Sequence, residues 1–149
     1  MTVRYLNYQD KYDVMNGKII AQRNELSELL HRRRNQRSFV SELNGGNGFQ
    51  IICGISTELC CAQYSRIDGS PPYLMAVSRH PPMKRGCVEF FAGDQPTPFA
   101  ARYIITFEEL KEVALHFLET GERSSAVSWK ELNPRATRED LRGRSRSMK

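Results

Sequence analysis

The fold is decided by residues 101–132, which read ARYIITFEELKEVALHFLETGERSSAVSWKEL. Within them, Thr106 and Glu109 have the spacing of a capping box, in which two side chains satisfy backbone amides at the start of a helix. Gly121 stands where a helix commonly ends in the left-handed conformation. These signals predict a helix over residues 107–120. Its buried face is formed by apolar residues at helical spacing, namely Phe107, Leu110, Val113, Ala114, Phe117 and Leu118.

Upstream of this helix, apolar residues alternate with the two-residue period of β-strands. The strand candidates are residues 18–21, 38–43, 49–55, 59–66, 73–78, 87–92 and 102–106, with one more ordered segment at 127–132. Their connections are too short for the crossover helices that parallel strands need. A second helix, from an Asn24 N-cap to about Arg33, carries a stripe of three leucines. We therefore predict an α+β fold, a mainly antiparallel β-sheet of about five to seven strands with one N-terminal and one C-terminal helix packed on it.

The composition suits a single globular domain of 149 residues, 40% of them hydrophobic and 26% charged. We place this domain at residues 1–133. The formal net charge is +5, of which +4 falls in residues 134–149, so this stretch is predicted to be a basic, flexible tail. No apolar run approaches the ~20 residues of a membrane span, and the N-terminus lacks the apolar core of a signal peptide. We therefore expect a cytoplasmic protein without membrane contact.

The sequence gives little support for catalysis. It contains neither a glycine-rich phosphate loop nor the zinc-deaminase motif. The histidines lie near the end of the first helix, in a proline-flanked loop and on the second helix, at His31, His80 and His116. We predict no catalytic residue and no cofactor, and therefore a protein that is not an enzyme.

The cysteines are Cys53, Cys60, Cys61 and Cys87. The only close pair is adjacent, a spacing that one metal ion accommodates poorly, so no metal site is predicted. Cys53, Cys61 and Cys87 lie in apolar strand candidates, where a free thiol acts as a small hydrophobic residue. A dyad of Cys60 or Cys61 with His80 is the third functional alternative, but no family-type signature surrounds it.

Two basic clusters leave another function open. The first is residues 31–37 and the second is residues 135–149. A small basic nucleic-acid-binding module would use Arg32, Arg33, Arg34, Arg37 and the arginine-rich tail. Neither cluster is interleaved with aromatic residues that stack on bases, and basic residues favour a helix C-terminus in any case. Direct nucleic-acid binding is therefore kept only as the alternative.

The C-terminal third of the domain resembles the family-1 immunity proteins of bacterial polymorphic toxin systems. The resemblance rests on Phe107-Glu108-Glu109-Leu110, Thr120-Gly121 and Val127-Ser128-Trp129-Lys130-Glu131, and extends over residues 39–132. The sequence differs from the family pattern in lacking a proline after Thr-Gly and in having the basic tail. The residues that form the structural signature are Phe107, Leu110, Phe117, Gly121, Trp129 and Glu131.

This resemblance implies a cytoplasmic antitoxin that is encoded beside a toxin, frequently a nucleic-acid deaminase, and that binds and inhibits it by occluding its active site. The expected partner is therefore a cognate toxin protein. A toxin that acts on nucleic acid presents a positive cleft, so we expect carboxylates and aromatic side chains on the inhibitor. The candidate partner-binding residues, chosen because they fall in loops and at strand ends, are Glu58, Asp68, Tyr73, Glu89 and Asp94.

Overall fold

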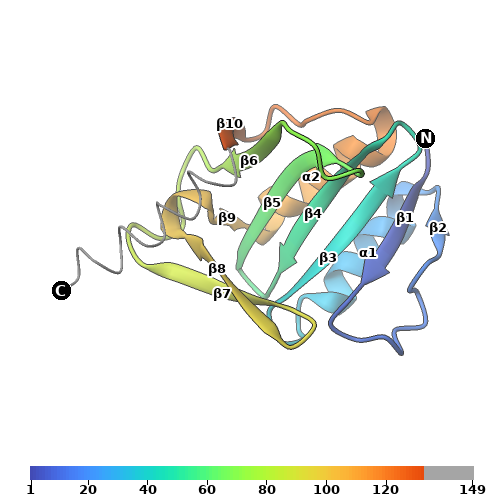
Figure 1. Ribbon diagram of the computed structural model, residues 1–149, viewed down its shortest axis with the longest axis horizontal. Coiled ribbons are helices and arrows are strands. Elements are labelled where there is room, and N and C mark those ends of the chain that lie inside the picture. The colour runs from blue at the N-terminus through green and yellow to red at the C-terminus, as the bar shows by residue number, and fades with distance from the viewer. Residues whose placement is uncertain (133–149) are drawn as a thin grey trace.

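The computed structural model describes residues 1–132, which form a curved sheet with two helices against one face (Figure 1). The elements are β1 (Val3–Asn7), β2 (Ile19–Ile20), α1 (Arg23–Arg33), β3 (Phe39–Gly45), β4 (Phe49–Ile55), β5 (Leu59–Arg66), β6 (Tyr73–Val77), β7 (Cys87–Ala92), β8 (Gln95–Ala100), a 3₁₀ turn (Ala101–Tyr103), β9 (Ile105–Thr106), α2 (Phe107–Thr120) and β10 (Ser128–Leu132). The predicted domain boundary at residue 133 and the predicted tail lie outside the described residues.

The sheet runs in the order β10-β6-β5-β4-β3-β1-β2, and every neighbouring pair in this series is antiparallel. Strand β9 pairs with the start of β5. The β7–β8 hairpin joins β3 through one parallel pair, Phe39 with Phe91. The predicted α+β class and mainly antiparallel sheet are confirmed, but residues 1–132 contain ten strands instead of five to seven.

The predicted strand number is too low because two strands carry residues that hide them. In β1, Val3 and Tyr5 face the core, but the third inward residue is the polar Asn7. Strand β8 contains Pro96 and Pro98, residues that cannot donate to a strand ladder and so argue against a strand. Within residues 1–132, β8 pairs only with β7, and an edge strand tolerates proline because the missing amide can point away from the ladder. These prolines also protect the edge from pairing with another chain.

Two element boundaries differ from the prediction. Helix α1 begins at Arg23 after Gln22, and the predicted N-cap residue Asn24 lies inside it. No side chain caps this end of the helix, so the buried stripe Leu26, Leu29 and Leu30 sets its position instead. The strand predicted at 102–106 shortens to β9, because the amide of Ile104 donates to the carbonyl of Ala101 and closes a 3₁₀ turn.

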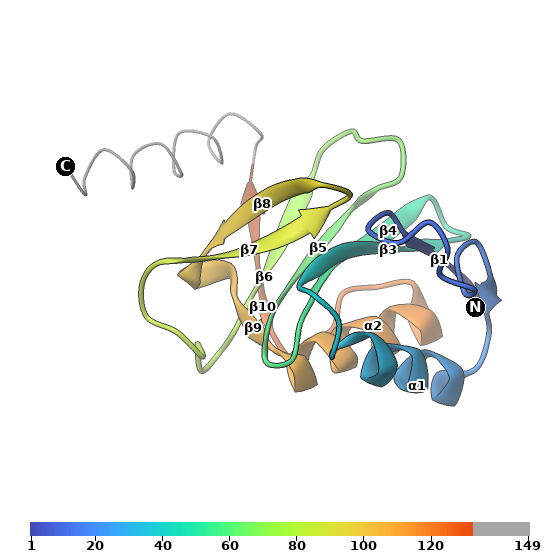
Figure 2. The ribbon, with the colours of Figure 1, turned by 90° about the horizontal axis from the view of Figure 1, so that it is seen from below.

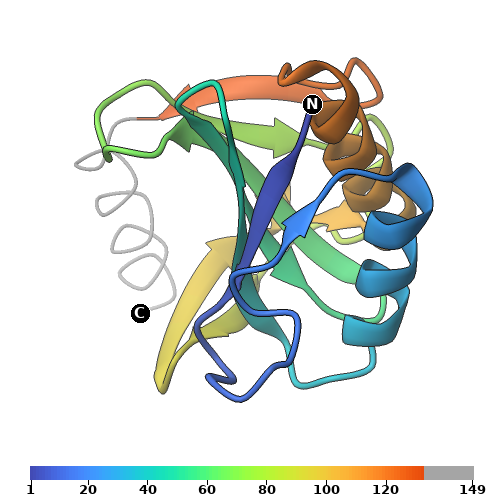
Figure 3. The ribbon, with the colours of Figure 1, turned by 90° about the vertical axis from the view of Figure 1, so that its right-hand side faces the viewer.

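Helix α2 forms as predicted, with both halves of its capping box made. The amide of Glu109 donates to the Thr106 hydroxyl at 3.1 Å, and the Thr106 amide donates to the Glu109 carboxylate at 2.9 Å. Gly121 ends the helix with φ 76°, and its amide donates to the Phe117 carbonyl at 2.7 Å. Both helices lie side by side on the same face of the sheet (Figure 3). The main core fills the space between this face and the helices.

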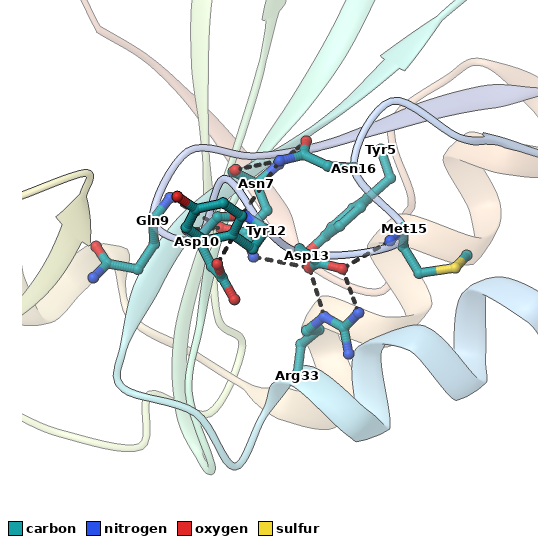
Figure 4. A network of polar contacts seen from close by, with 9 residues as sticks. All are labelled: Tyr5, Asn7, Gln9, Asp10, Tyr12, Asp13, Met15, Asn16 and Arg33. Carbon is teal, nitrogen blue, oxygen red and sulfur yellow. Dashed lines mark hydrogen bonds and ion pairs between the residues drawn. The ribbon is translucent and has the colours of Figure 1, made fainter.

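The loop between β1 and β2 is tied to α1 by a buried ion pair (Figure 4). The Arg33 guanidinium donates twice to the Asp13 carboxylate, from Nε at 2.8 Å and from a terminal nitrogen at 2.6 Å. The side chains are 13% and 3% exposed. Asn7 and the backbone amide of Met15 also donate to this carboxylate, each at 2.9 Å. Asp13 therefore organises the loop that follows β1.

Burial alone would raise the pKa of the Asp13 carboxyl, but other interactions outweigh it. The hydrogen bonds from Arg33, Asn7 and Met15, together with the guanidinium charge, hold the pKa at about 2. The carboxylate therefore stays ionised at any ordinary pH, and the loop stays attached to the end of α1.

Candidate functional site

We call the face of the sheet opposite the helices the open face. Figures 2 and 3 show both helices on the other side. Strand pairing sets the open-face residues side by side in two rows. They are Arg4, Asn44, Gln50, Ser65 and Tyr73 in one row, and Leu6, Glu42, Ile52, Gln63 and Met75 in the other. The intervening residues of these strands, such as Leu43 and Ile51, point into the main core.

One end of the open face is covered by the β7–β8 hairpin. Phe90 is fully buried there and packs edge-on against Phe99, with ring centroids 5.8 Å apart. A cavity of about 180 Å³ remains beneath the hairpin, between residues such as Gly54, Cys61 and Met75. This is smaller than the ~300–1,000 Å³ of most small-molecule sites. A larger depression between α1 and α2, of about 460 Å³, is wide open to solvent.

Gly54 fits closely beneath this hairpin. A Cβ atom added at this position would overlap the Cys61 sulfur and lie 3.0 Å from the Phe90 ring. Both neighbours are buried, so neither can move away freely. We expect Gly54→Ala to lower the free energy of unfolding by about 2 kcal/mol, as other overpacked cores do. Chemical denaturation measures this loss.

A double-mutant cycle tests the cause. The change Cys61→Ala removes the sulfur atom that the new methyl group would meet. The two substitutions together should therefore cost less than the sum of the single costs. Additive costs would contradict the proposed overlap.

Three of the four cysteines are buried, and their raised pKa values keep the thiols protonated. Burial raises the pKa of the Cys60 thiol to about 11, and the pKa values of Cys53 and Cys61 are also raised, chiefly by burial. His80 is exposed, so the structure does not favour a dyad with either buried thiol. Cys87 is exposed, and the prediction that it packs as a hydrophobic residue is wrong, because β7 turns Phe90 inward instead. Among residues 1–132, no group of three His, Cys, Asp or Glu side chains could hold a metal ion.

The arginines of the first basic cluster all have partners within the fold. Two form ion pairs, and two lie over aromatic rings at 3.6 and 3.8 Å from the ring centroid. The contacts are Arg32 with Glu28, Arg33 with Asp13, Arg34 with Phe107 and the Thr57 carbonyl, and Arg37 with Phe91. Arg33 and Arg34, which are half-buried, therefore contribute to packing, whereas Arg32 is exposed. The second basic cluster lies outside the described residues.

The predicted partner-binding residues occupy three separate places. Asp68 and Tyr73 lie at the β5–β6 turn, and Glu89 and Asp94 lie on the β7–β8 hairpin. Glu58 lies in the β4–β5 turn, at the other end of β5. The β5–β6 turn and the β7–β8 hairpin both project on the side away from the helices (Figures 2 and 3). Four of the five residues therefore flank the open face, and Glu58 does not join them.

The signature residues of the C-terminal third mostly serve the core. Phe107, Leu110 and Phe117 are buried in it, and Gly121 ends α2. Trp129 is half-buried on β10, and its indole nitrogen donates to the Ser124 carbonyl at 2.8 Å. Glu131 is the exception, since it is exposed.

A known protein-family model matches most of the chain. The family model described as Immunity protein Imm1 matches residues 20–131. The chain belongs to the Imm1 family of immunity proteins. The Imm1 match begins in β2 and ends in β10, so it includes both helices and the whole open face except β1. No curated protein matches the chain. None of the helices within residues 1–132 is long and apolar enough to cross a membrane.

One feature of the Imm1 open face, Glu42, was not singled out by the sequence analysis. Its strand neighbours in the pairing register are Leu6 and Ile52. The side chain is half-buried, and burial raises the pKa of its carboxyl, partly offset by a hydrogen bond from Tyr8. In sequence, Glu42 is only the polar member of an alternating strand. Its burial depends on pairing with strands that start 39 residues before it and seven residues after it, so no local signal reveals it.

Proposed function

We propose that this Imm1 protein is an antitoxin that neutralises a cognate toxin by binding over its active site. The Imm1 match carries the proposal, because an immunity protein has a toxin as its partner. We further propose that it acts by stoichiometric binding and not by catalysis, in the cytoplasm of a bacterium with a polymorphic toxin system.

The shape of the molecule supports binding through the open face. The β5–β6 turn and the β7–β8 hairpin stand at its two ends, and they carry the proposed contact residues Asp68, Tyr73, Glu89 and Asp94. A standard protein–protein interface buries ~800 Å² on each partner, and a sheet face with two projecting rims can supply such an area. Glu58 is proposed as a separate contact at the β4–β5 turn.

The β5–β6 turn already has ordered local structure. Asp68 accepts hydrogen bonds from the backbone and hydroxyl of Ser70, at 2.9 and 2.6 Å, and the Tyr73 hydroxyl donates to the Gly69 carbonyl. Ile67, in the same turn, is 43% exposed. A turn that is ordered before binding loses less entropy when the complex forms. We therefore propose the β5–β6 turn as a contact region that is ordered before binding.

A rescue experiment tests the antitoxin role. Cells that express the toxin from the neighbouring gene should survive when this protein is co-expressed, and the two proteins should co-elute at one to one. An Imm1 protein from another toxin pair serves as the control and should not rescue. Cell death at the same toxin dose, without a complex, would refute the role.

We propose a nucleic-acid deaminase as the toxin. Such an enzyme converts cytosine or adenine into a base that pairs differently, so unprotected cells should accumulate transition mutations. Sequencing of surviving cells, with and without this protein, measures the effect. Toxicity without deaminated bases in either DNA or RNA would reject the deaminase and leave the antitoxin role intact.

A further inference from the structure

We propose that Glu42, on the floor of the open face, receives a cationic arginine or lysine side chain of the toxin. The proposal deepens the function proposed above and rests on it. It assigns one contact at the centre of the face, between the two rims that carry the other proposed contacts.

The position of Glu42 follows from the register of the sheet. It lies on β3, directly opposite Leu6 on one side and Ile52 on the other. Strand β3 has neighbours on both sides, so Glu42 lies within the sheet and not at an edge. Its side chain points away from the helices, because Ser41 and Leu43 on either side of it are buried on the helix face.

The carboxylate lacks a cation within the fold. Tyr8 donates a hydrogen bond to it, but no Lys or Arg among residues 1–132 forms an ion pair with it. The nearest basic residue in the register is Arg4, which is exposed and lies opposite Asn44. A half-buried carboxylate gains most from a partner when a matching charge covers it and excludes water.

A second acceptor beside Glu42 on the open face lacks a hydrogen-bond donor among residues 1–132. Asn44, two residues along the same strand and on the same face, has a buried amide oxygen that accepts no hydrogen bond from residues 1–132. Lysine and arginine side chains carry donors and no acceptor, so they complement this surface. A phosphate group would instead be repelled by the carboxylate.

A basic surface is expected on the proposed toxin and agrees with this assignment. A toxin that acts on nucleic acid must attract phosphates and therefore carries lysine and arginine around its cleft. An inhibitor that covers this cleft meets those side chains. Glu42 is a half-buried carboxylate on the open face, and the acidic rim residues Asp68, Glu89 and Asp94 lie on the β5–β6 turn and the β7–β8 hairpin.

The test measures the affinity of the purified toxin, encoded by the neighbouring gene, for three variants of this protein. Glu42→Gln keeps the shape and removes the charge, and Glu42→Lys reverses it. Glu112→Lys is the matched control, because Glu112 is exposed on α2, on the opposite side of the molecule. We expect Glu42→Gln to weaken binding about 30-fold and Glu42→Lys more strongly, as for other buried charge pairs. The control should bind within about twofold, as a charge outside the interface does.

Thermal melting of each free variant shows that the fold is retained. Glu42→Gln should melt no lower than the parent protein, because an uncharged side chain is easier to bury. If the parent protein binds the toxin and both Glu42 variants bind equally well, the assignment is overturned and the antitoxin role stands. If the parent protein does not bind the toxin, both the antitoxin role and the assignment of Glu42 are refuted. A dimer of the parent protein that Glu42→Lys dissociates would assign the face to a second copy and would also overturn the proposal.

Discussion

Replacing Phe117 with alanine is expected to lower the free energy of unfolding by about 4 kcal/mol, within the range for buried phenylalanines. Phe117 is fully buried between α2 and the sheet, and its ring lies edge-on to Tyr64 with centroids 6.0 Å apart. The backbone of Gly45 also approaches the ring so closely that an added Cβ would lie 2.9 Å from it. Few neighbours can therefore collapse into the space left by the ring.

Urea unfolding, followed by the fluorescence of the single Trp129, measures this loss. Glu112→Ala on the exposed side of the same helix is the control, and it should change stability by less than about 0.5 kcal/mol. A Phe117→Ala variant as stable as the control would mean that α2 does not pack on the sheet as described.

Replacing Asp13 with alanine is expected to cost about 3 kcal/mol, because it leaves the Arg33 guanidinium largely buried without its counter-charge. The loss should depend on pH. The pKa of Asp13 is about 2 in the folded protein, below its ordinary value of 3.8. A depressed folded pKa gives stability that is fully present above the unfolded value and disappears as pH falls from about 4 to about 2.

Denaturation of the parent protein and of Asp13→Ala at several pH values measures the difference. The two curves should be about 3 kcal/mol apart at pH 7 and converge as the pH falls through this window. Asp10→Ala is the control, because Asp10 is exposed in the same loop and, among residues 1–132, its carboxylate accepts a hydrogen bond only from the Tyr12 amide. Its cost should stay near 1 kcal/mol and vary little with pH. A difference for Asp13→Ala that is the same at pH 2 and pH 7 would contradict the ion pair.

The parts of the fold that sequence predicts well are those determined by neighbouring residues. Helix α2 is the clearest case. Thr106 and Glu109 cap its first turn and Gly121 ends it, so each signal lies next to the helix end that it determines. The antiparallel arrangement follows in the same way from short connections. The prediction is less accurate at α1, where Asn24 is a good capping residue but the buried leucines fix the helix start.

The parts that sequence does not predict depend on residues distant in the chain. Asp13 and Arg33 are 20 residues apart, and nothing in either segment indicates that they pair. The first basic cluster suggests nucleic-acid binding until the structure shows that Arg34 and Arg37 lie over aromatic rings. The alternating pattern of β3 predicts that Glu42 faces solvent, whereas the pairing of β3 with β1 and β4 leaves it half-buried. Such features require the strand order.

We expect this Imm1 protein to neutralise its toxin by binding it one to one. The most direct measurement is the activity of a fixed amount of purified toxin against increasing amounts of this protein, at a toxin concentration well above the dissociation constant. The activity should fall linearly and reach zero at one equivalent. Full toxin activity in a tenfold excess of this protein would contradict the claim.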